Sequence, residues 1–124
     1  MATNIKATNM EMSGAIRDYL NKKLEKLNKF TRGKDDDATQ IDVEIGKSTM
    51  HHRTGDIFKA EINISLNGER FRAVAETADL YGSIDEAEEE IMNALRKSKD
   101  KKTNLFRRGG QKIKDMIRGW RREG

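Results

Sequence analysis

Lys and Arg residues gather at one end of this chain densely enough to bind a polyanion. Twelve of the 25 basic residues lie in the segment 96–124, which holds only three acidic residues. That segment therefore carries a net charge of +9 and residues 1–95 carry −5, although the whole chain carries only +4. A block of like charges this dense repels itself unless an anion neutralises it. Nucleic acid is the first candidate partner, and an anionic membrane surface is the second.

The chemistry that these side chains offer is the neutralisation of phosphate. On a predicted first helix, Lys22, Lys26 and Lys29 stand at positions i, i+4 and i+7, so they share an exposed stripe. Lys23 sits at the edge of the apolar stripe of the same helix. A predicted second helix begins with acidic residues and ends with five bases: Arg96, Lys97, Lys99, Lys101 and Lys102. Helix-dipole complementarity explains the order of these charges but not their density. We predict that both groups bind RNA.

Residues 103–124 form a basic tail that we expect to be flexible or to form a short amphipathic helix. Four apolar residues recur there at helical spacing: Ile113, Met116, Ile117 and Trp120. A helix this short is not stable alone in water, so it would fold on a partner. We predict that Arg107, Arg108 and Trp120 also contact RNA, with Trp120 stacking on a base. A membrane-bound helix and a disordered tail are the alternatives.

No arrangement of residues predicts catalysis. His51 and His52 are adjacent, so they are poorly placed to ligate one ion together, and the chain has no cysteine to complete a zinc site. The acidic run 35–37 lacks the glycine and the distal glutamate of a calcium loop. Gly-rich phosphate loops and nucleophile elbows are also missing from the sequence. We expect a binding protein without catalytic residues, metal or cofactor; a nuclease that uses the acidic run ranks last.

The hydrophobic pattern indicates which elements must position the bases. It predicts four strands, in which every second residue is apolar, and two helices, in which apolar residues recur at helical spacing. Ser13 and Asp79 are the predicted helix caps. In chain order, the elements are a strand at 3–8, a helix from Ser13 to about Phe30, strands at 40–45, 57–66 and 69–76, and a helix from Asp79 to roughly Lys99.

The last two strands form the best-determined unit of the pattern. Asn67 and Gly68 are the preferred pair for a two-residue hairpin turn. Such a turn pairs Ile64 with Phe71, Ile62 with Ala73, and Ala60 with Ala75, so one face is apolar. The other face is polar and needs no cover. We therefore predict an α+β fold of order β-α-β-β-β-α, in which both helices cover one face of a four-stranded mixed sheet, with the first two strands parallel if they are neighbours.

Length and composition favour one folded domain, which we place at 1–102, before the tail at 103–124. The absence of cysteine fits a reducing cytosol. No apolar run approaches the roughly 20 residues of a membrane helix, and the first residues lack the pattern of a signal peptide. We therefore expect a cytoplasmic monomer that does not bind membranes. The rival hypothesis is a membrane-surface or regulatory binding module that acts through the tail.

Two long motifs resemble one known family, the ribosome hibernation-promoting factors, which are also called ribosome-associated translation inhibitors. The string ADLYGSIDEAEEEIMNALRKSKDKK, which follows FRAVAE and the hairpin turn, is similar to the end of that family's domain. The first helix, MEMSGAIRDYLNKKLEKLNKF, is similar to its opening. The resemblance covers about residues 3–102. It departs at Ala94 and Ser98, where the family often has Gln and Tyr, so contacts through those two positions are not carried over.

The resemblance implies both a fold and a function. The family's fold is the β-α-β-β-β-α order predicted above, similar in arrangement to double-stranded-RNA-binding domains. Its members bind the small ribosomal subunit between head and body, where messenger RNA and transfer RNA would sit, and they inhibit translation in stationary phase or stress. Bases on both helices contact ribosomal RNA, which here implies the nine predicted helix bases. We expect a short form of the family, without room in 124 residues for the second domain by which long members dimerise ribosomes.

Overall fold

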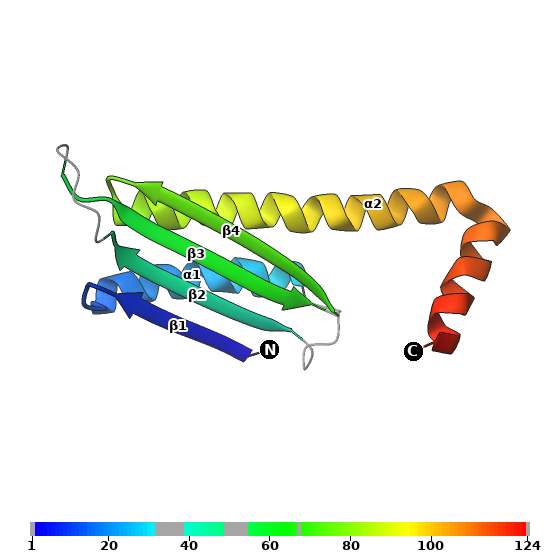
Figure 1. Cartoon of the computed structure of the whole chain (residues 1–124), viewed down its shortest axis with the longest axis horizontal. Helices are drawn as coiled ribbons and strands as arrows, with labels where there is room; N and C mark the ends of the chain where they lie inside the picture. Colours follow the sequence, from blue (N-terminus) through cyan, green and yellow to red (C-terminus); the bar gives the residue numbers. More distant parts are fainter. Residues whose placement is uncertain (1, 32–38, 49–54, 67, 124) are drawn as a thin grey trace. The chain divides into compact units, whose positions relative to one another are not determined.

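The computed structural model contains six elements in the predicted order (Figure 1). They are β1 (Ala2–Thr8), α1 (Gly14–Thr31), β2 (Gln40–Lys47), β3 (Phe58–Leu66), β4 (Glu69–Thr77) and α2 (Leu80–Glu123). The structure describes the backbone of residues 2–31, 39–48, 55–66 and 68–123, and the side chains of 3–31, 39–48, 55–66 and 68–102. It divides into two compact units, residues 1–92 and 93–124, and α2 contributes to both.

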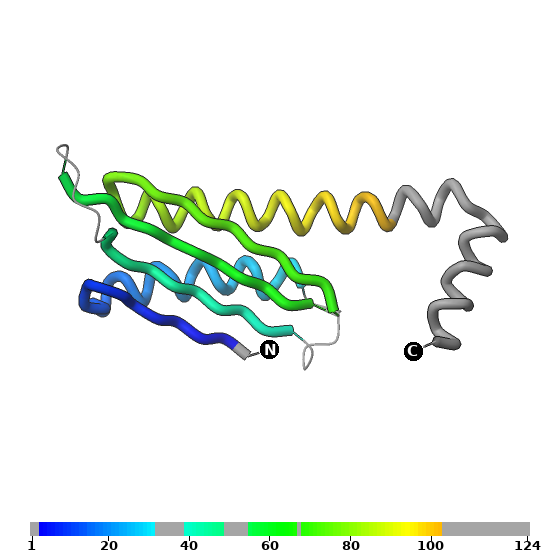
Figure 2. The backbone as a smooth tube through the Cα atoms, viewed as in Figure 1, coloured from blue at the N-terminus to red at the C-terminus, as the bar shows by residue number. Residues whose placement is uncertain are grey.

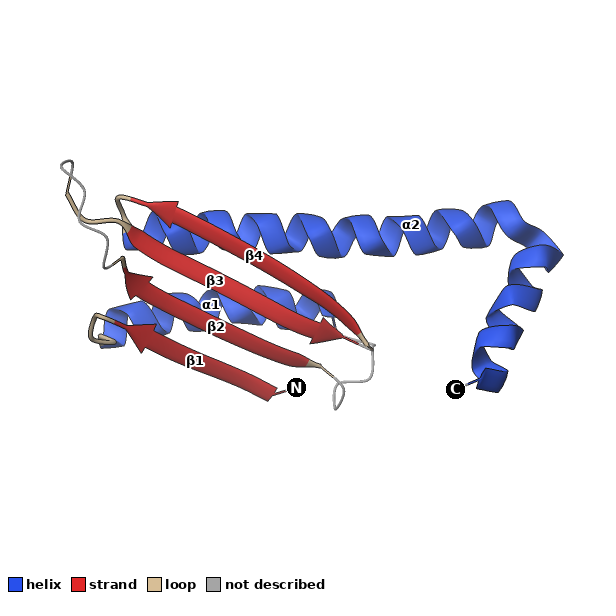
Figure 3. Cartoon of the chain, viewed as in Figure 1, coloured by secondary structure: helices blue, strands red, loops and turns tan. Residues whose placement is uncertain are grey.

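The four strands form one sheet in the order β1-β2-β3-β4 (Figure 3). β1 pairs with β2 in parallel, and the two other pairs are antiparallel. A parallel pair needs a long crossover, which α1 supplies. In the backbone trace of Figure 2, β1 and β4 lie at opposite edges of the sheet. The predicted mixed sheet and its parallel first pair are therefore confirmed.

The hairpin has the register that its turn and its apolar pattern predict. Ile64 lies opposite Phe71, Ile62 opposite Ala73, and Ala60 opposite Ala75. Gly68 has a φ of 85°, a left-handed conformation that glycine adopts without strain. Asn67 lies outside the described residues. Because the side-chain period of a strand is 2, this register places every apolar pair on the same face.

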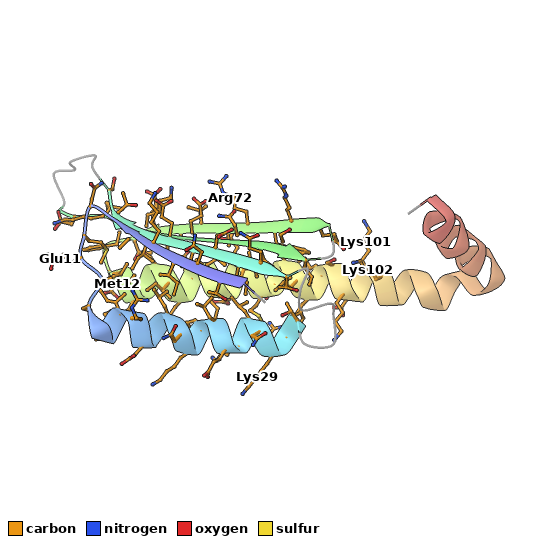
Figure 4. The ribbon with its side chains drawn as sticks, turned by 90° about the horizontal axis from the view of Figure 1, so that it is seen from below. Glu11, Met12, Lys29, Arg72, Lys101 and Lys102 are labelled. Atoms are coloured by element: carbon orange, nitrogen blue, oxygen red, sulfur yellow. The ribbon has the colours of Figure 1, made fainter. Side chains whose placement is uncertain are left out.

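One face of the sheet carries the core of the first unit. α1 and the first turns of α2 cover that face (Figures 1 and 4). The core side chains are nearly inaccessible to water: Leu20, Leu24 and Leu27 of α1, Ile41, Val43, Ile45, Ala60, Ile62, Ile64, Ala73 and Ala75 of the sheet, and Leu80, Ile84, Ala87 and Ile91 of α2. The predicted α+β class, with both helices on one face, is confirmed.

Both predicted helix caps are present. The backbone N–H of Ile16 donates to Oγ of Ser13 at 3.1 Å, and that of Gly82 donates to Oδ2 of Asp79 at 3.0 Å. These bonds satisfy amides that have no partner within the helix. The buried hydroxyl of Ser83 then donates to the carbonyl oxygen of Phe58 at 2.8 Å, which fixes the start of α2 against β3.

The predicted end of the second helix was wrong. The pattern ended it near Lys99, where the buried apolar stripe stops, but α2 extends to Glu123. No proline interrupts residues 80–123, and Lys and Arg are good helix formers. Apolar periodicity reports only the part of a helix that packs, so it could not show the extension. The division at residue 102 into a ribosome-binding domain and a tail stays a prediction.

Candidate nucleic-acid interface

The lysines of α1 form an exposed basic stripe opposite the buried side of the helix. Leu20, Leu24 and Leu27 turn into the core at helical spacing. Lys22, Lys26 and Lys29 therefore lie on the solvent side, and all three are exposed. Figure 4 shows Lys29 pointing away from the sheet. Within the described part of the chain, none of the three makes a hydrogen bond or an ion pair, so their ammonium groups are available to an external anion.

Lys23 differs from its neighbours because it has partners inside the first unit. Its Nζ lies 3.0 Å from Oδ1 of Asp85 and 4.0 Å from Oε2 of Glu88, both on α2. The same Nζ sits 5.2 Å from the ring centre of Tyr19. Its side chain is only 19% exposed. The structure thus gives Lys23 a place between the two helices, while the sequence analysis grouped it with the RNA contacts.

Aromatic and acidic side chains complete this interhelical network. The Tyr19 hydroxyl donates a hydrogen bond to Asp85, and its ring meets that of Tyr81 edge to face, with centroids 4.8 Å apart. Glu88 is 9% exposed, and its Oε2 atom has no hydrogen-bond partner among the described residues. The ammonium of Lys23 is the nearest compensation for this buried carboxylate. We call Tyr19, Lys23, Asp85 and Glu88 the interhelical network.

The charges of the network change the pKa values of its members. The hydrogen bond to Asp85 raises the pKa of Lys23 above its usual 10.5, against the effect of burial. Burial works against ionisation of Asp85, but hydrogen bonds from Tyr19 and Lys23 outweigh it and lower the pKa of Asp85 below 3.8. The bond to Asp85 raises the pKa of Tyr19. At pH values between the lowered pKa of Asp85 and the raised pKa of Lys23, both side chains of this pair are charged.

The network predicts a pH-dependent contribution to stability. A lowered pKa means that Asp85 stabilises the fold above about pH 4 and loses that effect as the pH falls toward its folded value. We expect Asp85→Asn to reduce the free energy of unfolding by about 0.5–1 kcal/mol near pH 7, a small value because the Asp85 side chain is half exposed. The difference should shrink near pH 2, as measured by urea unfolding at both pH values. Glu86→Gln, a change at an exposed acid one residue away, is the control. An Asp85→Asn deficit of the same size at both pH values would contradict this account.

The bases at the end of the predicted second helix belong to the second unit. Their side chains are exposed: Arg96, Lys97, Lys99, Lys101 and Lys102. Arg96 donates to Oδ1 of Asn93 at a long 3.5 Å, while Leu95 beside it is 3% exposed. The side chains of Arg107, Arg108 and Trp120 lie outside the described residues. Among the predicted RNA-contacting residues whose side chains the structure describes, only Lys23 is withdrawn from solvent.

Other predicted features concern metal ions and membrane spans. His51, His52 and the acidic run 35–37 lie outside the described residues. The side chains that are described include no group of three His, Cys, Asp or Glu residues suited to hold a metal ion. The same part of the chain contains no helix long and apolar enough to cross a membrane.

The polar face of the sheet carries one further feature that was not predicted from the sequence, a hollow. It has a volume of about 490 Å³, and Arg70 and Arg72 of β4 lie along it beside Asn63 and Ser65 of β3. Figure 4 shows Arg72 on the side of the sheet away from the helices. The predicted hairpin register already implies that Arg70 lies opposite Ser65 and Arg72 opposite Asn63, and this pairing could have indicated the hollow.

Known proteins show the same sequence pattern and fold. The sequence model of the family described as sigma 54 modulation protein / S30EA ribosomal protein matches residues 3–103. A ribosome hibernation promotion factor of Picosynechococcus sp. is 35% identical over 97 residues, which cover 78% of this chain and 48% of that protein. A ribosome hibernation promoting factor of Klebsiella oxytoca is 31% identical over 103 residues, or 82% of this chain and 96% of the relative. This chain thus spans about half the length of the first relative and nearly all of the second.

A solved structure extends the similarity to three dimensions. The N-terminal domain of Thermus thermophilus Protein Y superimposes with a TM-score of 0.63 at 28% identity. The superposition covers 78% of this chain and 98% of that domain. The superposition and the alignment with the Picosynechococcus relative cover the same share of this chain, 78%.

Proposed function

Because the chain belongs to the sigma 54 modulation protein / S30EA ribosomal protein family, we propose that it is a ribosome hibernation factor. In this proposal it binds the small ribosomal subunit and its ribosomal RNA, and it fills the sites of messenger RNA and transfer RNA. Translation then stops in stationary phase or under stress. The names of the two relatives support the assignment. The protein acts in the cytoplasm as a monomer, and it works by occupying space rather than by catalysis or with a cofactor.

The observation that carries this proposal is the exposed basic stripe of α1. Lys22, Lys26 and Lys29 stand on a helix whose opposite side is locked into the core. A rigid helix presents its charges without losing chain entropy on binding, and each phosphate that it neutralises releases counterions. The exposed bases of α2 add to the same attraction. Double-stranded RNA is recognised largely by its shape and backbone, which requires no base-specific pocket.

Lys23 has a different role in this proposal. Its ammonium neutralises Asp85 and approaches the buried carboxylate of Glu88. Moving it to an RNA phosphate would leave Asp85 with only the hydroxyl of Tyr19 and would take the cation away from buried Glu88, and an uncompensated buried charge is costly. We therefore assign Lys23 to the support of α1 against α2, and we keep Lys22, Lys26 and Lys29 as the RNA contacts of that helix.

The proposal predicts ribosome binding that weakens steeply with salt. If about six to eight phosphates are neutralised, the affinity should fall by about three orders of magnitude between roughly 50 and 200 mM monovalent salt. Co-sedimentation with ribosomes at constant magnesium measures this fall, and liposomes with anionic lipid provide the comparison. Binding to liposomes but not to ribosomes at low salt would favour the rival membrane-surface function. Ribosome binding that is indifferent to salt would rule out docking through phosphates.

Two adjacent lysines give this experiment a matched control. Lys22→Met should weaken ribosome binding and make its salt dependence shallower by roughly one phosphate contact. Lys23→Met should keep the salt dependence of the unchanged chain, because its charge is used inside the first unit, and should lower the free energy of unfolding instead. An equal decrease of the salt slope in both variants would show that Lys23 contacts RNA phosphate as Lys22 does.

A further inference from the structure

The polar face of the sheet has two halves with different charge chemistry. In the strand register, Glu44 lies opposite Glu61, whereas Asp42 lies opposite Asn63 and Gln40 opposite Ser65. On the adjoining strand, Arg72 lies opposite Asn63 and Arg70 opposite Ser65. The acids of the face therefore concentrate toward one end of the strands. The two arginines stand at the other end, on the edge strand β4.

Glu61 and Glu44, two acids of the first half, have partners within the sheet. Glu61 accepts a hydrogen bond from Asn63 at 2.8 Å, and its other oxygen lies 3.2 Å from Arg72 and 3.4 Å from Lys59. The bond from Asn63 is the largest cause of the lowered pKa of Glu61, with Arg72 and Lys59 adding to it against the effect of burial. Glu44 also accepts a bond, from the Thr8 hydroxyl at 2.8 Å. The carboxylates of Glu61 and Glu44 are thus already partnered.

The half with the hollow keeps an available cation. Arg70 is exposed, and among the described residues it has no hydrogen bond and no ion pair. Asp42, the acid that also lines the hollow, accepts a hydrogen bond from the amide of Gln40 at 3.2 Å. Ser65 supplies a hydroxyl directly opposite Arg70 in the register. The hollow thus combines the available guanidinium of Arg70 with hydroxyl and amide groups, and the carboxylate of Asp42 lies on the β2 side of it.

We propose that this hollow is a second RNA site, which takes the sugar-phosphate chain of a single strand. Arg70 holds a phosphate, and Ser65 and Asn63 reach the sugar or a base edge. Guanidinium, hydroxyl and amide groups are the side chains that make most contacts to phosphate and sugar. Arg70, Arg72, Asp42, Gln40, Asn63 and Ser65 outnumber the two apolar residues of the lining, Ile64 and Phe71, whereas sites for small apolar ligands are mainly hydrophobic. The position of β4 at the sheet edge leaves the hollow accessible to an extended chain.

The inference rests on the proposed function for the source of the RNA, namely the ribosome. Figure 4 shows Arg72 on one side of the first unit and Lys29 on the other. A domain that fills a cleft meets two walls. The basic stripe of α1 would bind one wall and the hollow would bind a strand on the other, so a single unit would join two RNA segments.

A pair of matched variants tests the site. Arg70→Gln removes the available charge of the hollow, and Lys6→Gln removes an exposed charge of β1, at the opposite edge of the sheet. Arg70→Gln should weaken ribosome binding by about three- to tenfold and reduce the salt slope by about 0.7, the value for one phosphate of a single strand. Lys6→Gln should change the affinity by less than about twofold. Equal affinities for Arg70→Gln and the unchanged chain would overturn the site while leaving ribosome binding established.

A titration without ribosomes keeps the two proposals distinguishable. A short single-stranded oligouridylate is added to the ¹⁵N-labelled full chain, with polyglutamate in a parallel titration. Shifts of the Ser65, Arg70 and Arg72 amides with oligouridylate, absent in Arg70→Gln, would support the site even if ribosomes did not bind. Equal shifts with polyglutamate would show a surface for any anion and would overturn the assignment to RNA. No shift of these amides would overturn it as well.

Discussion

Replacing Lys26, Arg96 and Lys99 with Glu is expected to abolish the inhibition of translation while the fold remains. All three side chains are exposed, so the core is not disturbed. Each reversal removes an attraction to phosphate and adds a repulsion, and the three together change the net charge by about −6, counted from reference charges at neutral pH. We expect the affinity for ribosomes to fall by at least about a thousandfold, because several phosphate contacts are lost and not merely weakened.

A purified translation system measures this effect directly, together with competition against initiator transfer RNA. Circular dichroism and urea unfolding check that the variant is folded. The matched control replaces Lys6, Lys47 and Lys59 with Glu. This variant has the same change in net charge, but its substitutions lie on the strands. Lys47 forms an exposed ion pair with Asp56, whose loss costs little stability. Lys59 pairs with Glu61, whose side chain is only 15% exposed, so urea unfolding must show that the control is folded as well. Full inhibition by the folded helix variant would show that the helix bases are not the docking surface.

Truncation after Lys102 should reduce ribosome affinity far more than it reduces stability. Residues 103–124 hold seven bases and two acids, so several phosphate contacts would be lost with them. We expect about a hundredfold lower affinity near physiological salt and a salt slope smaller by several units. The last buried apolar residue of α2 on the described side chains is Leu95, ahead of the cut, so the free energy of unfolding should change little.

Trp120→Ala separates stacking from charge in the same segment. Loss of one base–aromatic stack costs roughly 1–3 kcal/mol, so the affinity should fall about tenfold or more. The salt slope should stay almost unchanged, because no cation is removed. Ribosome binding is measured for the full chain, the truncation and Trp120→Ala over the same salt series. Identical affinity and salt slope for all three proteins would show that the tail does not contact ribosomal RNA. A membrane or a protein partner would then be the next candidate for it.

The sequence predicted the sheet well because two independent signals agreed. The turn pair before Glu69 and the alternation of apolar residues in β3 and β4 each imply the register that the structure has. The caps at Ser13 and Asp79 were predicted for a similar reason: a local side chain bonds a local amide. Such interactions join residues that are close in the sequence, so a short stretch of sequence is enough to predict them.

The features that the sequence did not predict depend on contacts between distant residues. Lys23 stands at the edge of the stripe of α1, and its partner Asp85 lies 62 positions further along the chain. Periodicity shows which side of a helix is buried, but it cannot show which acid on another helix meets a given lysine. The hollow likewise needs the register of three strands at once, from Gln40 through Ser65 to Arg70.

The position of β1 has a consequence for how the protein is made. β1 leaves the synthesising ribosome first, yet the strand with which it pairs, β2, begins about 38 residues later, and the core residues of α2 come later still. The hairpin of β3 and β4 has local contacts and can form early, whereas long-range pairing must wait for the intervening chain. The nascent chain therefore carries the lysines of α1 before it has the core that holds that helix in place. Under the proposed function, the lysines of α1 would therefore be held in place for docking only after α2 has been made and has packed against the sheet.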